Sequence, residues 1–384
     1  MRSELLIEMR ARLDRPLGEH AAALCQAGRP LVGYFCHYVP PEIVTAAGAL
    51  PLRLRGVGIE DSSLGDAYLS ERVCTYVRHV MSLALDGSLD EFAGVICSNT
   101  CDHVRRAADV FREKAKIPFV GFVSVPRALR EDLLPYYRDE LRRLYQGLCQ
   151  ALGTEATDEA LRAAIVQHDA VRRGLLRLGE VRLAEPPRLS GADALVATIA
   201  AQIMPPDAFV PWIDALLDDL ARAPSLDGVR ARVVLVGAEL DEPRYLDVIE
   251  GQGALVVSDR LCFGERSVLE PFHEQPTDPL DAIARAYFYQ PSCARMIGDF
   301  PERWAKLEGD LKVARADGVI FERLLFCDPW GAEQYNLNRR CRDRAIPLLS
   351  LTREYGIVPT GQLRTRVQAF VERIEIQGQK EVGQ

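Results

Sequence analysis

The sequence lacks several features that would assign the chain to a familiar class. No apolar run approaches the roughly 20 residues that span a bilayer, and the charged start MRSELLIEMRARLDRP has no signal-peptide centre. No basic stripe of the kind that binds nucleic acid is present, and the formal net charge is −8. The phosphate-binding pattern GxxxxGK(S/T) is also missing. We therefore expect a cytoplasmic protein that binds neither membranes nor nucleic acid and has no ATP-binding loop of this kind.

Short cysteine pairs are scarce, although the chain has ten cysteines in 384 residues. Only Cys97 and Cys101 approach the C-x2–4-C spacing of a structural zinc site. In a reducing cytoplasm, many cysteines indicate metal binding or catalysis more often than disulfides. Two interpretations remain open from spacing alone: a thiolate-bound iron–sulfur cluster whose ligands come from distant segments, or scattered core cysteines.

One pattern occurs twice. In residues 94–122 a strand-like run ends at Cys101, a helical stretch follows, and a second apolar strand closes the unit. In residues 318–351 the same order recurs around Cys327. Strands that alternate with helices in this way predict a parallel sheet with helices on its faces. The repeat therefore predicts two α/β parallel-sheet domains related by internal duplication.

A second matching pair lies upstream, in residues 31–54 and 234–259. In each, an apolar run reaches a glycine, a helix follows, and Gly-Ala-Leu opens the next strand. Ligands of parallel sheets collect beyond the carboxyl ends of the strands. The cysteines that fall at predicted strand ends are Cys36, Cys101, Cys262 and Cys327. We therefore expect one shared site between the two domains.

The chain divides into three predicted parts. Residues 1–126 form the first α/β domain with a leading helix. In residues 127–228 apolar residues recur at helical spacing, which predicts a helical insertion. Residues 229–384 form the second α/β domain. At 48% hydrophobic and 27% charged residues, the composition is that of a globular protein with room for such domains.

Four other cysteines are treated separately. Cys25 and Cys149 lie on predicted helices and are expected to be structural, because free cysteine packs as a small hydrophobe. Cys341, in a basic helix, is expected to be incidental. Cys97 alternates with Cys101, so that it belongs either to the buried face of its strand or to the site.

The sequence segments around the remaining cysteines resemble those of a known superfamily. It comprises the D components of 2-hydroxyacyl-CoA dehydratases, the cluster subunits of benzoyl-CoA reductase, and double-cubane cluster proteins. The resemblance covers nearly the whole chain and rests on the segments GYFCHYVPPEIVTAAGALPLRL, ERVCTYVRHV, SNTCDHVRR, DRLCFGER, DGVIFERLLFCDPW and LTREYGIVPTGQLRTRVQAFVE. It implies two Rossmann-like (flavodoxin-like) domains with an oxygen-sensitive iron–sulfur centre between them.

The resemblance also implies a ligand set. The motifs around Cys74, Cys101 and Cys327 match those of the three cysteines that hold one cubane in the dehydratases. The chain carries three more cysteines at comparable places, as the double-cubane branch does: Cys36, Cys262 and Cys293. We therefore expect a double-cubane 8Fe–9S cluster, with a single 4Fe–4S cubane as the alternative. Which three cysteines would hold which cubane stays open.

Partners follow from the same resemblance. In the family, low-potential electrons come from a separate ATP-hydrolysing activator that is itself an iron–sulfur protein, and the substrates are small molecules or CoA thioesters. We expect the same kinds of partner here. A chain that carries both cubanes needs no different partner chain to complete its site, so that a homodimer is favoured.

Reduction also needs proton donors within hydrogen-bond reach of the substrate. The candidates are His37 and His103, with Glu42 and Glu322 behind them. For each histidine the alternative is to orient a thiolate or cap a helix.

Simpler roles are expected for the charged residues near the cysteines. Asp102 and Asp328 directly follow cysteines and are expected to cap the next helices. Arg78, Arg105 and Arg106 either balance the charge of a cluster or lie on solvated helix faces.

Three functions are considered. The first is an iron–sulfur oxidoreductase of the double-cubane type that reduces a small molecule with activator-derived electrons. The second is the cluster-bearing subunit of a 2-hydroxyacyl-CoA dehydratase, a lyase, or of an enzyme of the benzoyl-CoA reductase type. The third is a non-catalytic electron-transfer subunit.

Overall fold

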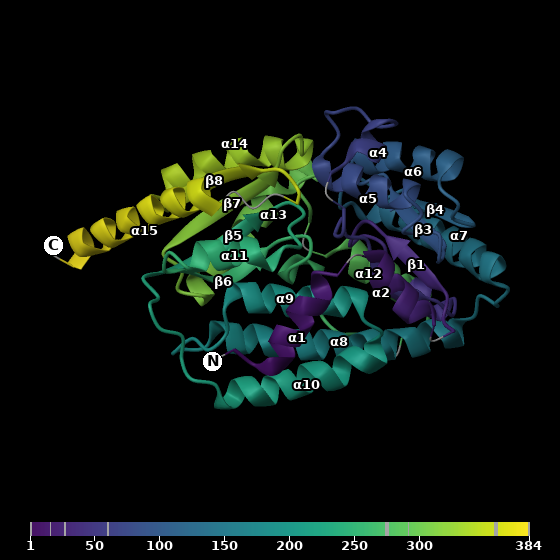
Figure 1. Cartoon of the computed structure of the whole chain (residues 1–384), viewed down its shortest axis with the longest axis horizontal. Helices are drawn as coiled ribbons and strands as arrows, with labels where there is room; N and C mark the ends of the chain where they lie inside the picture. The colour runs from purple at the N-terminus through teal and green to yellow at the C-terminus, as the bar shows by residue number, and fades with distance from the viewer. Residues whose placement is uncertain are drawn as a thin grey trace.

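The computed structural model describes residues 2–15, 17–26, 28–59, 61–272, 276–290, 292–356 and 360–382. Two parallel sheets of four strands each form its centre (Figure 1). The first contains β1 (Leu31–Tyr34), β2 (Leu50–Arg53), β3 (Phe92–Ser98) and β4 (Phe119–Val123). The second contains β5 (Ala231–Gly237), β6 (Ala254–Arg260), β7 (Gly318–Leu324) and β8 (Leu348–Arg353). The predicted α/β class is confirmed.

The two sheets have the same topology. Their strand orders are β2-β1-β3-β4 and β6-β5-β7-β8, and all pairs are parallel. In each half the chain therefore starts on an inner strand, crosses to one edge, and returns to the other side. Strands such as β1, with all four residues buried, read as continuous apolar runs because helices cover both faces. The duplicated sequence pattern thus corresponds to a duplicated topology.

Helices connect the strands of each sheet. In the first half these are α3 (Pro41–Ala46), α4 (Ser63–Asp66), α5 (Thr75–Leu85) and α6 (Asp102–Lys114), preceded by α1 (Glu4–Leu13) and α2 (Leu17–Cys25). In the second half they are α11 (Pro243–Glu250), α12 (Pro279–Phe288), α13 (Phe300–Val313) and α14 (Asp328–Asp343), and α15 (Thr360–Val382) closes the chain. Short 3-10 turns lie at Glu131–Leu133, Glu265–Ser267 and Ile297–Asp299.

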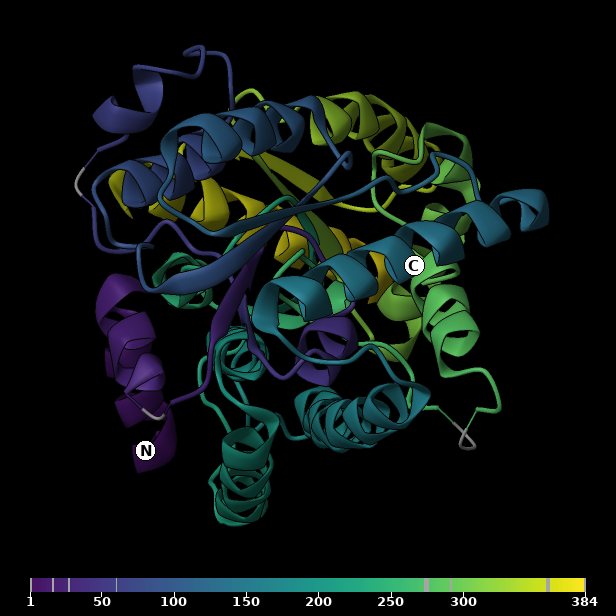
Figure 2. The same cartoon turned by 90° about the vertical axis from the view of Figure 1, so that its right-hand side faces the viewer.

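Between the halves the chain is helical. The helices are α7 (Leu134–Leu152), α8 (Asp158–Leu183), α9 (Gly191–Ile203) and α10 (Pro206–Arg222). Side chains of Thr157 and Ser190 cap α8 and α9 by accepting N–H bonds from the first turn. Helices α8 to α10 lie on one side of the molecule in both views (Figures 1 and 2). Because α9 contacts both β2 and β6, this layer supports both sheets.

Buried polar contacts join the two halves directly. Arg55 Nε, just after β2, lies 3.0 Å from Asp241 Oδ2, just after β5. Tyr355 donates its hydroxyl to the same carboxylate at 2.6 Å and accepts the Gly56 N–H at 2.8 Å. Since these residues are buried, the carboxyl ends of the two sheets are held in a fixed relation to each other.

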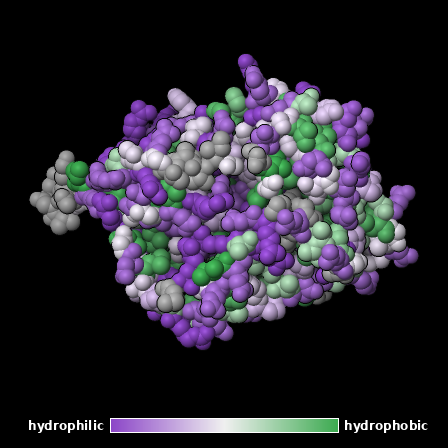
Figure 3. All heavy atoms as spheres, viewed as in Figure 1, coloured by the Kyte–Doolittle hydropathy of each residue, from purple (hydrophilic) through white to green (hydrophobic). Residues whose placement is uncertain are grey.

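Within the described residues, no helix combines the length and the apolar character needed to cross a bilayer. The face in Figure 3 mixes hydrophilic and hydrophobic residues, and the hydrophobic ones lie in small scattered groups.

Candidate functional site

The six cysteines singled out in the sequence line one cavity, here called the thiol cavity. It lies between the two halves and has a volume of about 70 Å³. The first half contributes Cys36, Cys74 and Cys101 to its wall, and the second contributes Cys262, Cys293 and Cys327. Ligands that lie far apart in the sequence therefore face one space.

Strand ends and helix starts place these thiols. Cys36 and Cys262 follow the carboxyl ends of β1 and β6. Cys74, Cys101 and Cys327 are the N-cap residues of α5, α6 and α14. A helix N-terminus favours negative charge, because its first N–H groups are unpaired and its dipole is positive there. Three of the six sulfurs therefore lie where a thiolate is stabilised.

The N-cap positions of α6 and α14 are not occupied by the two aspartates that were expected there. Asp102 and Asp328 are the first residues of α6 and α14, one position too late to be the caps. The Cys101 sulfur instead accepts the N–H of Val104 at 3.5 Å. The cap position thus belongs to the cysteine, which is consistent with a sulfur aimed into the cavity.

One group of thiols comprises Cys74, Cys101 and Cys327. Burial is the main cause that raises the pKa of each. The charge of Cys74 further raises the pKa of both Cys101 and Cys327, and Cys101 also acts on Cys327. Because such effects fall off with distance, these three sulfurs are neighbours.

A second group forms around Cys293. Burial again raises the pKa of Cys36 and of Cys262, and the Cys293 thiol raises both further. The groups touch, since Cys36 acts on the pKa of Cys101 and Cys293 acts on that of Cys327. The charges of the six thiols thus act on one another across both halves of the cavity.

Two buried arginines adjoin the thiols. Arg53 is fully buried, pairs with Glu239 at 3.3 Å, and stacks 4.5 Å from the centre of the Phe263 ring. Arg266 is 2% exposed, and its Nη2 donates to the Cys262 sulfur. Its Nε and Nη1 have no hydrogen-bond partner among the described residues. The charge of Glu239, which lines the thiol cavity, acts on the pKa of both arginines. Two cations and one carboxylate thus adjoin the thiols, and this net positive charge favours a negatively charged occupant.

These features test whether the cavity fits an iron–sulfur group. Among the described residues, no three His, Cys, Asp or Glu side chains converge closely enough for a single metal ion. Six thiols spread around one cavity instead suit a group that brings several metal ions and sulfides of its own. The soft thiol donors of the cavity wall fit such a cluster.

Both candidate histidines line the thiol cavity. His37 Nδ1 lies 4.0 Å from the Cys36 sulfur, and its buried Nε2 has no partner in the part of the chain that the structure describes. Burial, followed by Arg266 and Arg53, holds the pKa of His37 well below its ordinary value, so that the ring is neutral. His103 Nδ1 accepts the backbone N–H of Cys74 at 3.2 Å, and burial lowers its pKa as well.

The structure does not bring Glu42 or Glu322 to the wall of the thiol cavity. Glu42 is fully buried on α3, paired with Arg172, and accepts the Tyr287 hydroxyl at 3.0 Å. Glu322 points from β7 to Arg353, 2.9 Å away. Both carboxylates form ion pairs inside the two halves, which does not favour the predicted role as proton donors.

The sequence pattern missed three charged residues near the thiols: Arg53, Glu239 and Arg266. Glu239 follows β5, at the carboxyl edge where cavity residues were expected, so that its position alone would have indicated it. No sequence signal indicates the two arginines. Arg53 on β2 and Arg266 in the turn after β6 come near the thiols only in the folded chain. The suggested Arg105 is instead half-exposed and pairs with Asp102.

The remaining cysteines lie elsewhere. Cys97 is fully buried within β3 and does not line the thiol cavity, so that the structure favours the core position of the two left open. Cys149 and Cys341 are buried within α7 and α14, and Cys25 ends α2.

Comparison with known proteins identifies the class to which this fold and site belong. Residues 36–374 match the family of the 2-hydroxyglutaryl-CoA dehydratase D-component. This match covers most of the chain, including all six thiols of the cavity, and the chain belongs to this family. The resemblance seen in the cysteine motifs is confirmed.

Three curated relatives illustrate the range of the family. One benzoyl-CoA reductase subunit, from Thauera aromatica, is 26% identical, over 91% of this chain and 92% of that protein. A putative dehydratase subunit, YjiM, of Escherichia coli is also 26% identical, over 91% and 93%. The beta subunit of (R)-2-hydroxyglutaryl-CoA dehydratase of Acidaminococcus fermentans is 25% identical, over 90% and 93%. The relatives are thus subunits of reductases and of dehydratases.

Proposed function

We propose that the six thiols hold an iron–sulfur cluster and that the protein reduces a small molecule with low-potential electrons from a separate ATP-hydrolysing activator. The observation that carries the proposal is the convergence of six cysteines from both halves on one buried cavity. Family membership supports it, because the relatives include subunits of a reductase and of dehydratases.

Six thiols on one cavity allow two triads, as a double-cubane cluster would need. In this proposal Cys74, Cys101 and Cys327 would hold one cubane, and Cys36, Cys262 and Cys293 would hold the other. Such a cluster supplies electron transfer at low potential. Its negative charge would be balanced by Arg53 and Arg266, whose charges act on the pKa of the cavity thiols Cys36 and Cys262.

The two histidines have different roles. His103 accepts the Cys74 N–H at Nδ1, so that a neutral ring carries its proton on Nε2 and fixes the turn before α5. The buried Nε2 of His37 is unpartnered among the described residues, and the ring lines the cavity. We propose that the neutral His37 ring donates a hydrogen bond from Nε2 to the substrate and that His103 orients the Cys74 loop.

The cellular location, the energy source and the oligomeric state follow from the same proposal. An oxygen-sensitive cluster and thiols kept reduced place the protein in the cytoplasm of an anaerobic or oxygen-protected cell. Energy for the low-potential electrons must come from the activator, because the sequence has no phosphate-binding loop of its own. One chain supplies both triads, which favours a homodimer over an obligate heterodimer.

A second candidate is the cluster-bearing subunit of a CoA-thioester dehydratase or of a benzoyl-CoA reductase-type enzyme. It is favoured by the names of the relatives, which refer to benzoyl-CoA and (R)-2-hydroxyglutaryl-CoA. It predicts one cubane and a requirement for a different partner chain. A third, non-catalytic electron carrier predicts that no added substrate changes the spectrum of the cluster.

The deciding experiment is the iron and acid-labile sulfide content of protein prepared without oxygen. About eight irons per chain support the double cubane, and about four support the single-cubane reading. Cys36→Ala and Cys293→Ala should each lower the iron content by about half in the first case and leave it unchanged in the second. Cys341→Ala, a buried cysteine outside the cavity, is the matched control and should keep the full content.

An iron content near zero after reconstitution with iron and sulfide would overturn both cluster proposals. Equal loss of iron in Cys36→Ala and Cys341→Ala would show that the cavity is not the binding site.

A further inference from the structure

Cys293 is the one thiol of the cavity that neither a strand end nor a helix start places. The other five follow a strand or cap a helix. Among the described residues between the end of α12 and the 3-10 turn at Ile297–Asp299, none belongs to a helix or a strand. Fixing the backbone of an irregular segment costs conformational entropy at each residue. The position of this thiol therefore depends on contacts from other elements.

Arg303 of α13 makes such contacts to the backbone around Cys293. Its Nη1 lies 2.7 Å from the carbonyl oxygen of Met296, 3.1 Å from that of Cys293 and 3.0 Å from Ser292 Oγ. The carbonyl oxygen of Cys293 also accepts the N–H of Met296 at 2.9 Å, which closes a tight turn. One guanidinium group thus holds both ends of the turn that begins at Cys293.

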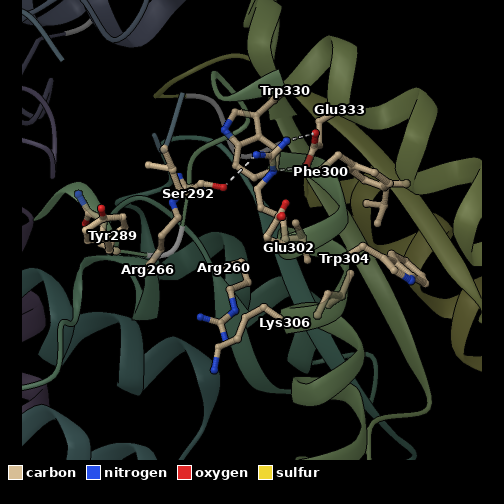
Figure 4. A pocket seen from close by; sticks show the side chains of 16 residues that line it. Arg260, Arg266, Tyr289, Ser292, Phe300, Glu302, Trp304, Lys306, Trp330 and Glu333 are labelled. Carbon is tan, nitrogen blue, oxygen red and sulfur yellow. Dashed lines mark hydrogen bonds and ion pairs between the residues drawn. The ribbon is translucent and has the colours of Figure 1, made fainter. Parts of the chain in front are cut away.

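Glu333 of α14 fixes the guanidinium group of Arg303. The carboxylate accepts two bonds, from Nε at 2.6 Å and from Nη2 at 2.8 Å. Figure 4 shows Ser292 and Glu333 on either side of this contact, and its dashed lines mark the bonds to both. Paired bonds of this kind fix the plane and the direction of an arginine side chain. Because α14 begins directly after Cys327, the pair ties the Cys293 turn to the helix that carries another cavity thiol.

The contact between Arg303 and Glu333 is a closed ion pair. Their side chains are only 11% and 8% exposed, and each neutralises the charge of the other. Both line a pocket of about 300 Å³ between α13 and α14 (Figure 4), whereas neither lines the thiol cavity. Arg303 thus differs from Arg53 and Arg266, whose charges act on the cavity thiols. Its contribution to the thiols is geometric.

Contacts from the first half of the chain reach the same segment. The hydroxyl of Tyr38 accepts the N–H of Cys293 at 3.3 Å, and Arg295 donates to the carbonyl oxygen of Val125 at 3.1 Å. These bonds anchor the segment between the two halves. Arg303 adds the side-chain contact to the carbonyl oxygens of the turn, so that its loss should free the turn without detaching the segment.

We propose that Arg303 and Glu333 act as a clamp that positions the Cys293 thiol for metal binding. With the clamp closed, the turn presents Cys293 to the cavity that the other five thiols line. Without it, the turn samples other conformations, and Cys293 is lost as a ligand although its side chain is intact. The role in metal binding rests on the proposed function, whereas the effect of the clamp on the thiol does not require a bound cluster.

The test follows the reactivity of each cysteine separately. Anaerobic protein as prepared is treated with iodoacetamide, and peptide mass spectrometry measures the alkylation of every thiol over time. Arg303→Met should raise the rate at Cys293 relative to Cys74 by about tenfold or more, because at least one hydrogen bond from a charged donor is lost. Glu333→Gln keeps the size of the side chain and should raise the rate at Cys293 by a smaller factor.

Two comparisons separate positioning from a general loss of stability. Arg10→Met breaks a similarly buried ion pair, to Asp193 of α9, in which the side chains are 15% and 10% exposed. It should leave the rate at Cys293 unchanged. The double variant of Arg303 and Glu333 should expose Cys293 no more than Arg303→Met alone, since both changes act through one contact. Melting temperature verifies that the variants are folded.

Iron content of the same samples links the clamp to the cluster. In the double-cubane case Arg303→Met should lower the iron content by about half, as Cys293→Ala does. An unchanged rate at Cys293 in Arg303→Met overturns the clamp, and so does an equal rise at all six cavity thiols. Either result in protein with full iron sinks the clamp alone. Selective exposure of Cys293 in protein that binds no iron supports the clamp and sinks only the cluster.

Discussion

At the scale of single residues, buried charge decides what this site can hold. Arg53 has a carboxylate partner in Glu239, whereas among the described residues Arg266 has only the Cys262 thiol as a hydrogen-bond partner. Burial raises the pKa of that thiol, and Glu239 is a carboxylate whose charge favours both cations. An anionic group in the cavity would balance the second positive charge. The same arginines therefore serve stability and the proposed cluster together.

A buried histidine away from the thiols gives a prediction at this scale. His168 Nε2 lies 2.8 Å from Thr45 Oγ1, and burial lowers the pKa of His168 to about 4, with Arg172 opposing its charge and Glu42 favouring it. Its unfolded value is near 6.5, so that only the unfolded chain takes up this proton as the pH falls from 6.5 to 4. Stability from this group is therefore present at neutral pH and lost in acid.

His168→Gln should remove that pH dependence, because glutamine can keep the bond to Thr45 and does not titrate. Between pH 7 and pH 5 the wild type should lose about 2 kcal/mol of unfolding free energy more than the variant does. Urea unfolding of both proteins at the two pH values measures the difference. Equal losses would show that His168 is not neutral in the folded protein.

At the scale of elements, the N-termini of three helices position half of the six cavity thiols. Cys74, Cys101 and Cys327 all occupy N-cap positions, where a helix begins just after a strand or a turn. The geometry that ends the strand therefore also exposes the sulfur at the positive end of a helix. Cys101 combines two roles, since its sulfur also accepts the Val104 N–H.

Serine and alanine at position 101 should separate these roles. Cys101→Ser and Cys101→Ala should both lose the iron of their triad. The serine variant should be about 1 kcal/mol more stable than the alanine variant, because a hydroxyl can cap the helix and a methyl group cannot. Thermal unfolding of the iron-free proteins measures this.

Cys341, inside α14 and buried, serves as the comparison. There serine should be no better than alanine, because a buried hydroxyl gains no cap. If the serine and alanine variants showed the same order of stability at position 101 as at position 341, the capping role of Cys101 would be contradicted.

At the scale of the whole molecule, the cavity exists because two halves are locked together. Tyr355, near the carboxyl end of the second sheet, bridges Asp241 and the backbone of Gly56 in the first half. Arg295 adds bonds to the carbonyl oxygens of Val125 and Pro126. Helix α12 packs on α7, and α7 in turn packs on β4 of the first sheet. We expect the chain to unfold as one unit.

Tyr355→Phe tests this coupling. The change leaves the buried Gly56 N–H without its partner and should lower the unfolding free energy by about 1–3 kcal/mol. Tyr335→Phe, on an exposed side chain of α14, is the control and should have no effect. Calorimetry should show a single transition in the wild type, and two resolved transitions would mean that the halves unfold independently.

The sequence predicted site residues best where the residue type and its position in the fold pattern indicated the same role. Cys262 and Cys327 follow apolar strands, and parallel strands end at one edge, so that their convergence could be predicted. Glu42 and Glu322 also lie near cysteines in the sequence, yet they pair with Arg172 and Arg353 away from the thiols. Proximity along the chain does not fix which face of a helix or strand a side chain occupies relative to a distant partner.

The sequence by itself determined the two parallel sheets, their shared order of elements and the cysteines at their strand ends, because apolar periodicity and repeated motifs are local. The tertiary structure decided how the two halves face each other, and therefore that six thiols from both halves line one cavity with Arg53 and Arg266 close by. These contacts join residues that only packing brings together, and no local pattern encodes them.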